Sequence, residues 1–373
     1  MTAVISNTQL RDILYRVGGQ TVPEFVWEWF FHYFGAGASV LSNEPADLLP
    51  NYHALISMGI ALLENRYSNG SYAKIIKDLQ TPQFTYYFVG DTHGSFDDVY
   101  QLINYFVQVF QVRSDVKVVW IGDIVDRNPY DLQNLALIMS FWILFPDNVF
   151  ILRGNHEDPS VCSRYGFSEH LYQKSGSKTT FNPIWDLIIQ FFSRLPIGML
   201  CQIGEKRVGV FHGGFPFDPE NFKVWAIEEV EPLLNCFKPE YFDMDPMSVS
   251  ILWADPDPTL SEGVAPNPRT GRPRYSEAAI TAFMDKNHLS CIIRGHSKWD
   301  DGYRLFFGNR VVSLFSTSTY DNKPIGQAKF LRLQPSTQLI ELGEEEPNLG
   351  KGVLSISAPF LARQLEFYYR ART

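Results

Sequence analysis

Six side chains that could bind metal ions stand in short turns along this sequence. They are Asp91, His93, Asp123, Asn155, His212 and His296. The set combines imidazoles, carboxylates and one amide without any thiolate, which suits divalent manganese, iron or zinc. Because a carboxylate has two oxygens, Asp123 could bridge two such ions, and a pair of ions about 3.5–4 Å apart can hold the attacking and leaving oxygens of a displacement at phosphorus. The residue types therefore predict a centre of two divalent metal ions that carries out phosphoryl chemistry.

Arginines accompany the same turns. They are Arg127, Arg153 and Arg294, with a further group formed by Arg269, Arg272 and Arg274. A guanidinium can contact two phosphoryl oxygens at once and stays charged at any working pH. Taken singly, each turn has an ordinary explanation, since glycine often follows a strand and a lone histidine such as His212 can belong to a core. Five consecutive turns that each offer a metal-type side chain beside a glycine favour the functional explanation.

The elements that must position these turns can be inferred from the apolar runs that precede them. YYFVGDTHG, VKVVWIGDIVDR, NVFILRGNHED, RVGVFHGG and LSCIIRGHS each begin with a run of the length of a buried strand. DDVYQLINYFVQVF and LALIMSFWILF lie between the first three and are expected as helices. Asp91 and Asp123, and likewise Asp123 and Asn155, are 32 residues apart, the size of a strand–helix–strand unit. Parallel strands end at one edge of their sheet, so we expect the turns to converge there.

The chain divides into three parts by pattern. Residues 1–83 carry helix-like patterns in PEFVWEWFFHYF, ALISMGIALLENRY and YAKIIKDLQ, and we expect a helical N-terminal extension. Residues 84–335 hold all the chemical turns, form the expected catalytic domain and end in the strand-like runs RVVSLFS and AKFLRL. Residues 336–373 form a C-terminal tail whose last segment, FLARQLEFYYRART, predicts a short helix without an assigned function.

Composition limits the classes of protein to consider. The 373 residues are 45% hydrophobic, as in folded proteins, and the formal net charge of −9 disfavours a general nucleic-acid binder. Four widely spaced cysteines form no CxxC pair, and the first residues show no secretory signal pattern. The longest apolar run, Leu135 to Phe145, is too short to span a bilayer. We therefore expect a cytoplasmic protein with no nucleic-acid and no membrane partner.

The ordered motifs resemble the signature of one enzyme family. GDTHG (90–94), GDIVDR (122–127), RGNHE (153–157), HGG (212–214) and RGH (294–296) are similar to the motifs of PPP-type metallophosphatases, the phosphoprotein Ser/Thr phosphatases related to calcineurin. FFSRLPIG, ILWADPDP and DGYRLFFGNRVVSLFSTSTY resemble further segments of that family, so the resemblance spans about residues 84–333. It implies an α/β fold, a metallophosphatase-type β-sandwich with flanking helices built on βαβ units.

The resemblance also implies how the metal ligands divide. Asp91, His93 and Asp123 would hold one metal ion, and Asp123, Asn155, His212 and His296 would hold the other. The native ions would be manganese, iron or zinc.

Further residues receive catalytic roles from the same resemblance. His156 would protonate the leaving alkoxide as general acid, with Asp126 orienting its imidazole. Arg127, Asn155 and Tyr320 would contact the phosphate. Ungapped counting back from RGH selects Arg269 as a second phosphate-binding arginine, but NPRTGRPRYS is irregular, so Arg272 and Arg274 remain open.

This sequence departs from the family pattern at several positions without losing a metal ligand. Asn128 stands where the family usually has glycine, Asp158 where many eukaryotic members have cysteine, and Ala254 where serine is usual. TYDNKPIG lacks the Cys-Gly-Glu pattern of the toxin-sensitive members, which leaves sensitivity to such inhibitors open.

The function that the resemblance implies is metal-dependent hydrolysis of phosphoserine and phosphothreonine monoesters in proteins, by direct attack of a metal-bridging hydroxide. Phosphoprotein substrates are the expected partners, and a regulatory partner could bind through the N-terminal extension. One alternative is a hydrolase of nucleotides such as dinucleoside polyphosphates, because the same centre would serve that chemistry. Another is a scaffold that keeps the fold without catalysis. Phosphotyrosine is also open as a substrate, since a shallow site discriminates little.

Overall fold

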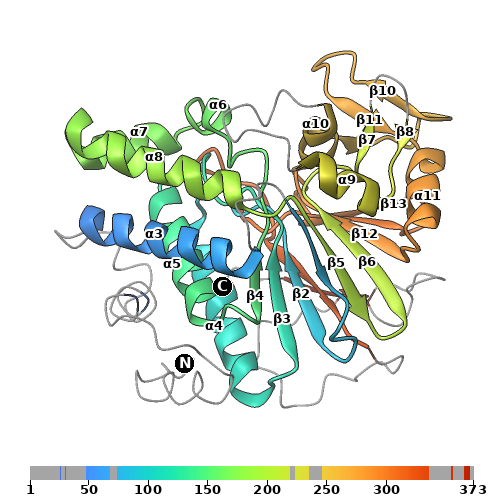
Figure 1. The fold of residues 1–373 in the computed structure, drawn as a ribbon, viewed down its shortest axis with the longest axis horizontal. Coiled ribbons are helices and arrows are strands. Elements are labelled where there is room, and N and C mark those ends of the chain that lie inside the picture. The colour runs from blue at the N-terminus through green and yellow to red at the C-terminus, as the bar shows by residue number, and fades with distance from the viewer. Residues whose placement is uncertain are drawn as a thin grey trace.

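The computed structural model describes residues 48–67, 74–218, 223–234, 246–335, 354–355 and 365–369, together with Val26 and Phe30. In this part of the chain, two six-stranded sheets pack face to face and helices cover the outer faces (Figure 1). The α/β sandwich expected from the motifs is confirmed.

The first sheet contains two of the strands that lead into predicted ligands. Its order is β1 (Ile75–Asp78), β5 (Gly198–Ile203), β6 (Lys206–Phe211), β12 (Cys291–Arg294), β14 (Val311–Leu314) and β13 (Tyr303–Phe306). Strands β6, β12 and β14 are parallel, whereas β5 and β13 run antiparallel to their inner neighbours. As a result, β6 and β12 end at the same edge of the sheet.

The second sheet contains the other three strands that lead into predicted ligands. Its order is β18 (Leu354–Ser355), β19 (Leu365–Tyr369), β17 (Lys329–Leu333), β2 (Thr85–Val89), β3 (Val116–Trp120) and β4 (Val149–Ile151). Strands β2, β3 and β4 are parallel, and α4 (Phe96–Val112) and α5 (Asp131–Leu144) connect them in turn. The two predicted βαβ units are confirmed, and the C-terminal ends of the three strands lie side by side.

Side chains of the inner strands alternate between two cores. In β2, Tyr86 and Phe88 lie in the core between the two sheets, whereas Tyr87 and Val89 lie in the core beneath the helices. Because both faces of these strands are covered, apolar residues stand at successive positions instead of every second one.

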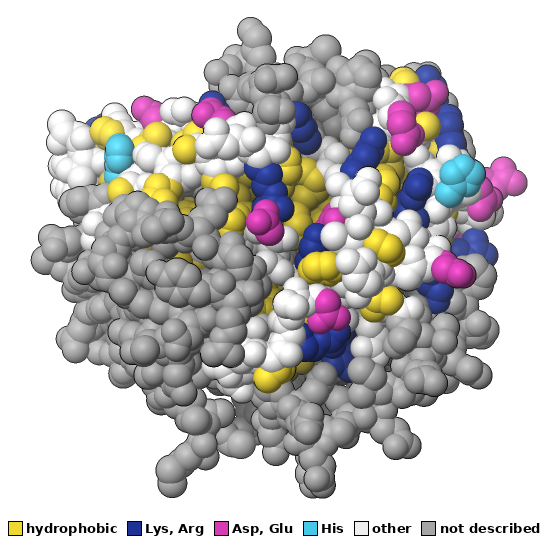
Figure 2. Space-filling model, turned by 60° about the horizontal axis from the view of Figure 1, so that its bottom comes forward, with side chains coloured by type: hydrophobic (Ala, Val, Ile, Leu, Met, Phe, Trp, Pro, Cys, Tyr) yellow, Lys and Arg dark blue, Asp and Glu magenta, His cyan; other side chains and the backbone are white. Residues whose placement is uncertain are grey.

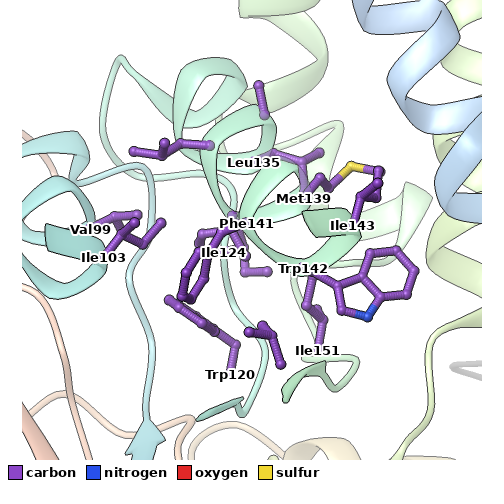
Figure 3. Close-up of a cluster of buried hydrophobic side chains, with 14 of the residues drawn as sticks. Val99, Ile103, Trp120, Ile124, Leu135, Met139, Phe141, Trp142, Ile143 and Ile151 are labelled. Atoms are coloured by element: carbon purple, nitrogen blue, oxygen red, sulfur yellow. The ribbon is translucent and has the colours of Figure 1, made fainter. Parts of the chain in front are cut away.

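Helix α5 lies at the centre of the helical layer over the second sheet. Around it pack α3 (Leu48–Tyr67), α4 and α7 (Phe167–Ser175), while α8 (Lys178–Arg194) packs on α3 and α7. Every residue of α5 is buried, as its apolar sequence predicts. Figure 3 shows Phe141 facing Trp120 of β3, with ring centroids 6.0 Å apart, and Val99 and Ile103 of α4 beside them. Truncating a ring such as Phe141 to alanine costs about 3–5 kcal/mol.

The outer face of the first sheet has its own helices, α9 (Ile227–Leu234), α10 (Pro246–Trp253) and α11 (Glu277–Lys286) (Figure 1). The remaining elements are short. They are α6 (Pro159–Cys162), the pair β7 (Phe217–Asp218) and β8 (Lys223–Val224), the group β10 (Val264–Pro266), β11 (Pro273–Tyr275) and β9 (Asp255–Pro256), and the hairpin of β15 (Thr319–Tyr320) and β16 (Lys323–Pro324). No helix in the described ranges is long and apolar enough to cross a membrane.

Two segments that the sequence predicts as helices are strands. Within YAKIIKDLQ, Ile75 and Ile76 are buried, and the backbone of β1 pairs with residues 198–201 of β5. In the tail, β19 pairs antiparallel with β17, which would otherwise be the edge of this part of the sheet. In both cases a pairing partner far along the chain overrides the local pattern.

The other two predictions for the N-terminal region have different outcomes. The helix expected from ALISMGIALLENRY is confirmed in α3. PEFVWEWFFHYF lies outside the described residues except for Val26 and Phe30, which are helical and fully buried.

Candidate metal centre

The six predicted ligands follow the C-terminal ends of strands from both sheets. Asp91 and His93 follow β2, Asp123 follows β3, Asn155 follows β4, His212 follows β6, and His296 follows β12. All are buried except His296, which is half-buried. The sandwich thus gathers at one end residues that are up to about two hundred positions apart in sequence.

One group of ligand atoms forms around His93. Its Nε2 atom lies 3.5 Å from Asp123 Oδ2 and 3.9 Å from Asp91 Oδ2. Its Nδ1 atom lies 3.0 Å from the carbonyl oxygen of Val125. A carbonyl oxygen can only accept, so Nδ1 carries the proton and Nε2 is left for a cation.

A second group forms around His212. Its Nε2 atom lies 3.2 Å from Asp123 Oδ1 and 2.9 Å from Asn155 Oδ1. Asn155 Oδ1 lies in turn 2.7 Å from His296 Nδ1. The Nδ1 atom of His212 donates to the carbonyl oxygen of Ile121 at 2.9 Å. This bond orients the ring, as the bond to Val125 orients that of His93. Asp123 therefore presents one oxygen to each group, as the bridging role requires.

The charges of this cluster fit divalent cations. Asp91 Oδ2 is buried and has no hydrogen-bond partner in the described part of the chain, although Oδ1 accepts from the His296 backbone N–H at 2.8 Å. Burial and the neighbouring Asp123 charge raise the pKa of Asp91 well above its ordinary value. Although burial opposes it, the ring of His212 helps hold the pKa of Asp123 well below its ordinary value. An unpartnered buried carboxylate oxygen is costly, and a metal ion is one way to satisfy it.

The ligand turns have unusual backbone geometry. His93, Asp123 and His296 have φ angles of +43°, +52° and +70°, in the left-handed region that side-chain-bearing residues rarely occupy. Gly154 packs so closely against Asp123 that a Cβ atom would overlap the Asp123 backbone nitrogen and Oδ1. Strain of this kind persists only where the surrounding structure enforces it.

Glu157 helps to hold these turns in their strained geometry. The sequence analysis assigned it no role. Its carboxylate is fully buried and accepts hydrogen bonds of 2.8 Å from the backbone N–H groups of Asp123, Ile124 and Gly154. Burial raises its pKa to about 7. The residue was visible as the last letter of RGNHE, but two of its three partners, Asp123 and Ile124, lie in a turn more than thirty residues earlier. It joins the turns after β3 and β4.

The predicted acid and its orienting group lie next to the ligands. His156 Nδ1 is 2.6 Å from Asp126 Oδ2, and Asp126 Oδ1 accepts from the backbone N–H of Phe167 at 2.9 Å. Burial lowers the pKa of His156 to about 4 and raises that of Asp126 to about 7. His156 also lies within reach of a cation held by His93 and Asp123.

Arg127 is held between two tyrosine rings. Its guanidinium carbon lies 4.0 Å from the ring centroid of Tyr165 and 5.0 Å from that of Tyr320, and Nη1 lies 3.4 Å from Asp321 Oδ1. The ring of Tyr320 lies 5.3 Å from that of His93. The structure thus brings the predicted Arg127 and Tyr320 to the ligand cluster and adds Tyr165, which the sequence analysis missed.

The choice of Arg269 as second phosphate-binding arginine is not supported by its position. Arg269 is exposed in the turn between β10 and β11, and its side chain makes no described contact. Arg272 instead lies over the ring of Trp253 at 4.2 Å, and that ring lies 5.6 Å from the ring of His296. After burial and Arg127, the charge of Arg272 also contributes to lowering the pKa of His156. Arg274 is paired with Asp257. Arg272 is therefore the arginine beside the ligands.

Asn128, a departure from the family pattern, connects the first ligand turn to the hairpin of Tyr320. Its Nδ2 donates to the carbonyl oxygens of His93 at 2.6 Å and Thr319 at 3.0 Å, and its Oδ1 accepts from the Asn322 backbone N–H at 3.1 Å. A cavity of about 410 Å³ adjoins this junction and is lined by Asn128, Tyr130 and Thr319, among others. The cavity thus lies beside the turn that carries His93.

Comparison with known proteins places this geometry in a family. Residues 84–299, more than half of the chain, match the sequence profile described as calcineurin-like phosphoesterase. A probable serine/threonine-protein phosphatase of Encephalitozoon cuniculi is 32% identical over 249 residues, which are 66% of this chain and 50% of that protein. The chain therefore spans about half the length of this curated relative.

A solved structure gives the same fold. A protein serine/threonine phosphatase from Saccharomyces cerevisiae, described as similar to the human phosphatase PP5, superposes with a TM-score of 0.66 at 21% identity. The match covers 90% of this chain and 95% of that one.

Proposed function

Because this chain belongs to the calcineurin-like phosphoesterase family, we propose that it hydrolyses phosphoserine and phosphothreonine monoesters in proteins. The observation that carries the proposal is the pair of ligand groups that share Asp123, with the His156–Asp126 pair beside them. The identity to a probable serine/threonine-protein phosphatase supports the choice of substrate class.

Two divalent ions, manganese, iron or zinc, would be held at this site. Asp91, His93 and Asp123 would hold one, and Asp123, Asn155, His212 and His296 the other. When bound, such ions neutralise phosphoryl oxygens and lower the pKa of water.

The remaining steps belong to the side chains of this chain. Arg127 and Arg272 approach the ligands from two sides and would bind the phosphoryl oxygens between them. The ring of Tyr320 limits the positions open to the Arg127 guanidinium. His156 would give its proton to the oxygen of the leaving serine or threonine, and Asp126 holds the imidazole in the orientation for this transfer.

The cavity beside Asn128 supports a peptide as substrate. A phosphorylated side chain reaching the ligands needs room for its neighbours along the chain, and this space of about 410 Å³ adjoins the turn of His93. Substrate choice would then depend on its walls as well as on the metal centre.

The test is a comparison of substrates with the purified chain supplied with Mn²⁺, Fe²⁺ or Zn²⁺. We expect phosphate release from phosphoserine and phosphothreonine peptides, faster than hydrolysis of diadenosine tetraphosphate. Asp91→Asn should abolish the release and His156→Asn should slow it strongly, whereas the exposed control Asp186→Asn should leave it unchanged. A chain that binds two ions but releases phosphate from none of the peptides would show that the proposal is wrong.

A further inference from the structure

A second cavity lies at the other end of the sandwich, away from the candidate metal centre. Its volume is about 480 Å³, and its lining includes Arg66 at the end of α3, Lys74 and Lys77 at β1, and Lys117 near the start of β3. Asp123 follows the opposite end of β3, so the length of the sheet separates the two sites. Four cationic side chains thus meet at one cavity in a protein of net charge −9.

The one carboxylate in the lining is already neutralised. Asp78 accepts hydrogen bonds from Lys117, from Tyr86 Oη at 2.7 Å and from Thr81 Oγ1 at 2.7 Å. Both Asp78 and Lys117 are largely buried, so they form a close ion pair at the base of the cavity. Arg66, Lys74 and Lys77 add three further positive charges to its lining.

Arg66 is the side chain that most clearly lacks an acceptor. Its guanidinium lies over the ring of Phe150 at 4.7 Å and over that of Tyr67 at 5.8 Å. The Nη1 atom is buried and has no hydrogen-bond partner in the described part of the chain. Nη2 lies 3.9 Å from Asp147, whose side chain is 83% exposed. A buried donor without an acceptor is costly, and a bound anion would remove that cost.

Each of the two lysines has a described contact at the cavity that an anion could replace or share. Lys74 donates to the carbonyl oxygen of Tyr67. Lys77 Nζ lies 4.0 Å from Glu228, whose side chain is 69% exposed. Long ion pairs between exposed side chains contribute little to stability. The lower side of the molecule, seen in Figure 2, shows Lys and Arg side chains beside hydrophobic ones across its middle.

We propose that this cavity binds an anion of the phosphate class, with Arg66 as the central contact and Lys74 and Lys77 beside it. A guanidinium fork matches two phosphoryl oxygens, and lysines add point charges. The volume is larger than one phosphate needs, so the ligand is a phosphate carried on a further group, either a small phosphorylated molecule or a phosphorylated side chain. The proposal does not depend on the catalytic function, because none of its residues approaches the metal ligands.

Orthophosphate is the probe that tests the site, with binding measured by calorimetry on the full chain. The metal-loaded chain should bind two phosphates, one at each end of the sandwich. After removal of the metals by a chelator, one should remain. Arg66→Gln should weaken that remaining binding by about ten-fold or more, since it removes a charge-assisted contact. Arg310→Gln, which removes a partly exposed arginine of a surface ion pair elsewhere, is the matched control and should change nothing.

A second variant guards against loss of folding, because Arg66 packs on aromatic rings. Lys77→Gln alters a more exposed side chain and should weaken phosphate binding several-fold while thermal unfolding stays unchanged. Binding of pyrophosphate and of a peptide with a non-hydrolysable phosphoserine analogue is measured in the same way. Tighter binding of pyrophosphate indicates a small phosphorylated molecule as ligand, and tighter binding of the peptide indicates a phosphorylated side chain. A metal-free wild type that binds no phosphate, or unchanged affinity in both variants, would overturn the proposal. Neither result would bear on catalysis.

Discussion

The turns that hold the candidate metal ligands and the loop that carries Arg272 are built differently, although they border one site. The turns after β2, β3 and β4 are buried, and Glu157 ties two of them through three backbone N–H groups. The segment from β10 to β11 is largely exposed, and Arg272 is placed there by a single ring, that of Trp253. The candidate ligands are thus positioned by the core, whereas Arg272 is positioned by a side-chain contact near the surface.

The largest effect is expected from a substitution that loosens the buried turns. Glu157→Gln keeps the volume but replaces one of the two carboxylate oxygens that accept backbone hydrogen bonds with an NH2 group that can only donate. We expect metal affinity to fall by about 10–100-fold, as for other groups that position metal ligands. Metal titration followed by activity would measure it. If excess metal fails to restore activity in a folded variant, Glu157 does more than hold the turns.

Substitutions of Arg272 and Arg269 test the exposed loop. Arg272→Met should raise the KM for phosphopeptides by about ten-fold, because it removes one charge-assisted contact with phosphate. Arg269→Met is the matched control, and we expect wild-type kinetics from it since its side chain contacts nothing described. The reverse ranking in steady-state kinetics would return Arg269 to the site.

Asn128 links a buried ligand turn to the hairpin of Tyr320, and its substitution offers a smaller effect. Asn128→Gly restores the residue usual in the family and removes three hydrogen bonds to the turn of His93 and the hairpin of Tyr320. We expect KM to rise about 2–5-fold with little loss of metal, because each such bond contributes about 0.5–1.5 kcal/mol. Kinetics with a phosphopeptide and metal analysis together test this. Equal loss of metal and of substrate affinity would mean that the hairpin also supports the ligands.

The smallest expected effect concerns an ion pair outside both regions. His170 Nδ1 lies 3.0 Å from both oxygens of Asp131, and this hydrogen bond raises the pKa of His170 above 6.5. The stabilisation is therefore complete below pH 6.5 and is lost as the pH rises through the raised pKa. Between pH 6 and 8, the free energy of unfolding of the wild type, measured by chemical denaturation, should fall by less than about 1 kcal/mol relative to that of His170→Gln. A constant difference between the two proteins over this range would contradict the assignment.

The sequence was informative where local pattern and tertiary structure agree. The convergence of the candidate ligands could be predicted because each follows an apolar run with a glycine turn. Helix α4 could be predicted from its apolar face, and α5 from its apolar residues on all faces. Strand β1 could not, since Ile75 and Ile76 read as part of a helix until β5, more than a hundred residues later, supplies their partner. Strand β19 was missed for the same reason.

Residues that act through long-range partners were also out of reach. Glu157 and Asn128 carry no signal of their roles, because the groups they bond come from other turns. Arg272 could be named only as one of three, since counting along the chain fails where an irregular loop separates the motifs. The ring contact with Trp253, which favours Arg272, exists only in three dimensions.

The central claim is that Asp123 is shared by two neighbouring metal ions. Anomalous diffraction from crystals grown with Mn²⁺ tests it most directly, because it locates each ion independently of the protein atoms. We expect two peaks about 3.5–4 Å apart, with Asp123 contacting both. A single peak at full occupancy, or two peaks that do not share Asp123, would contradict it.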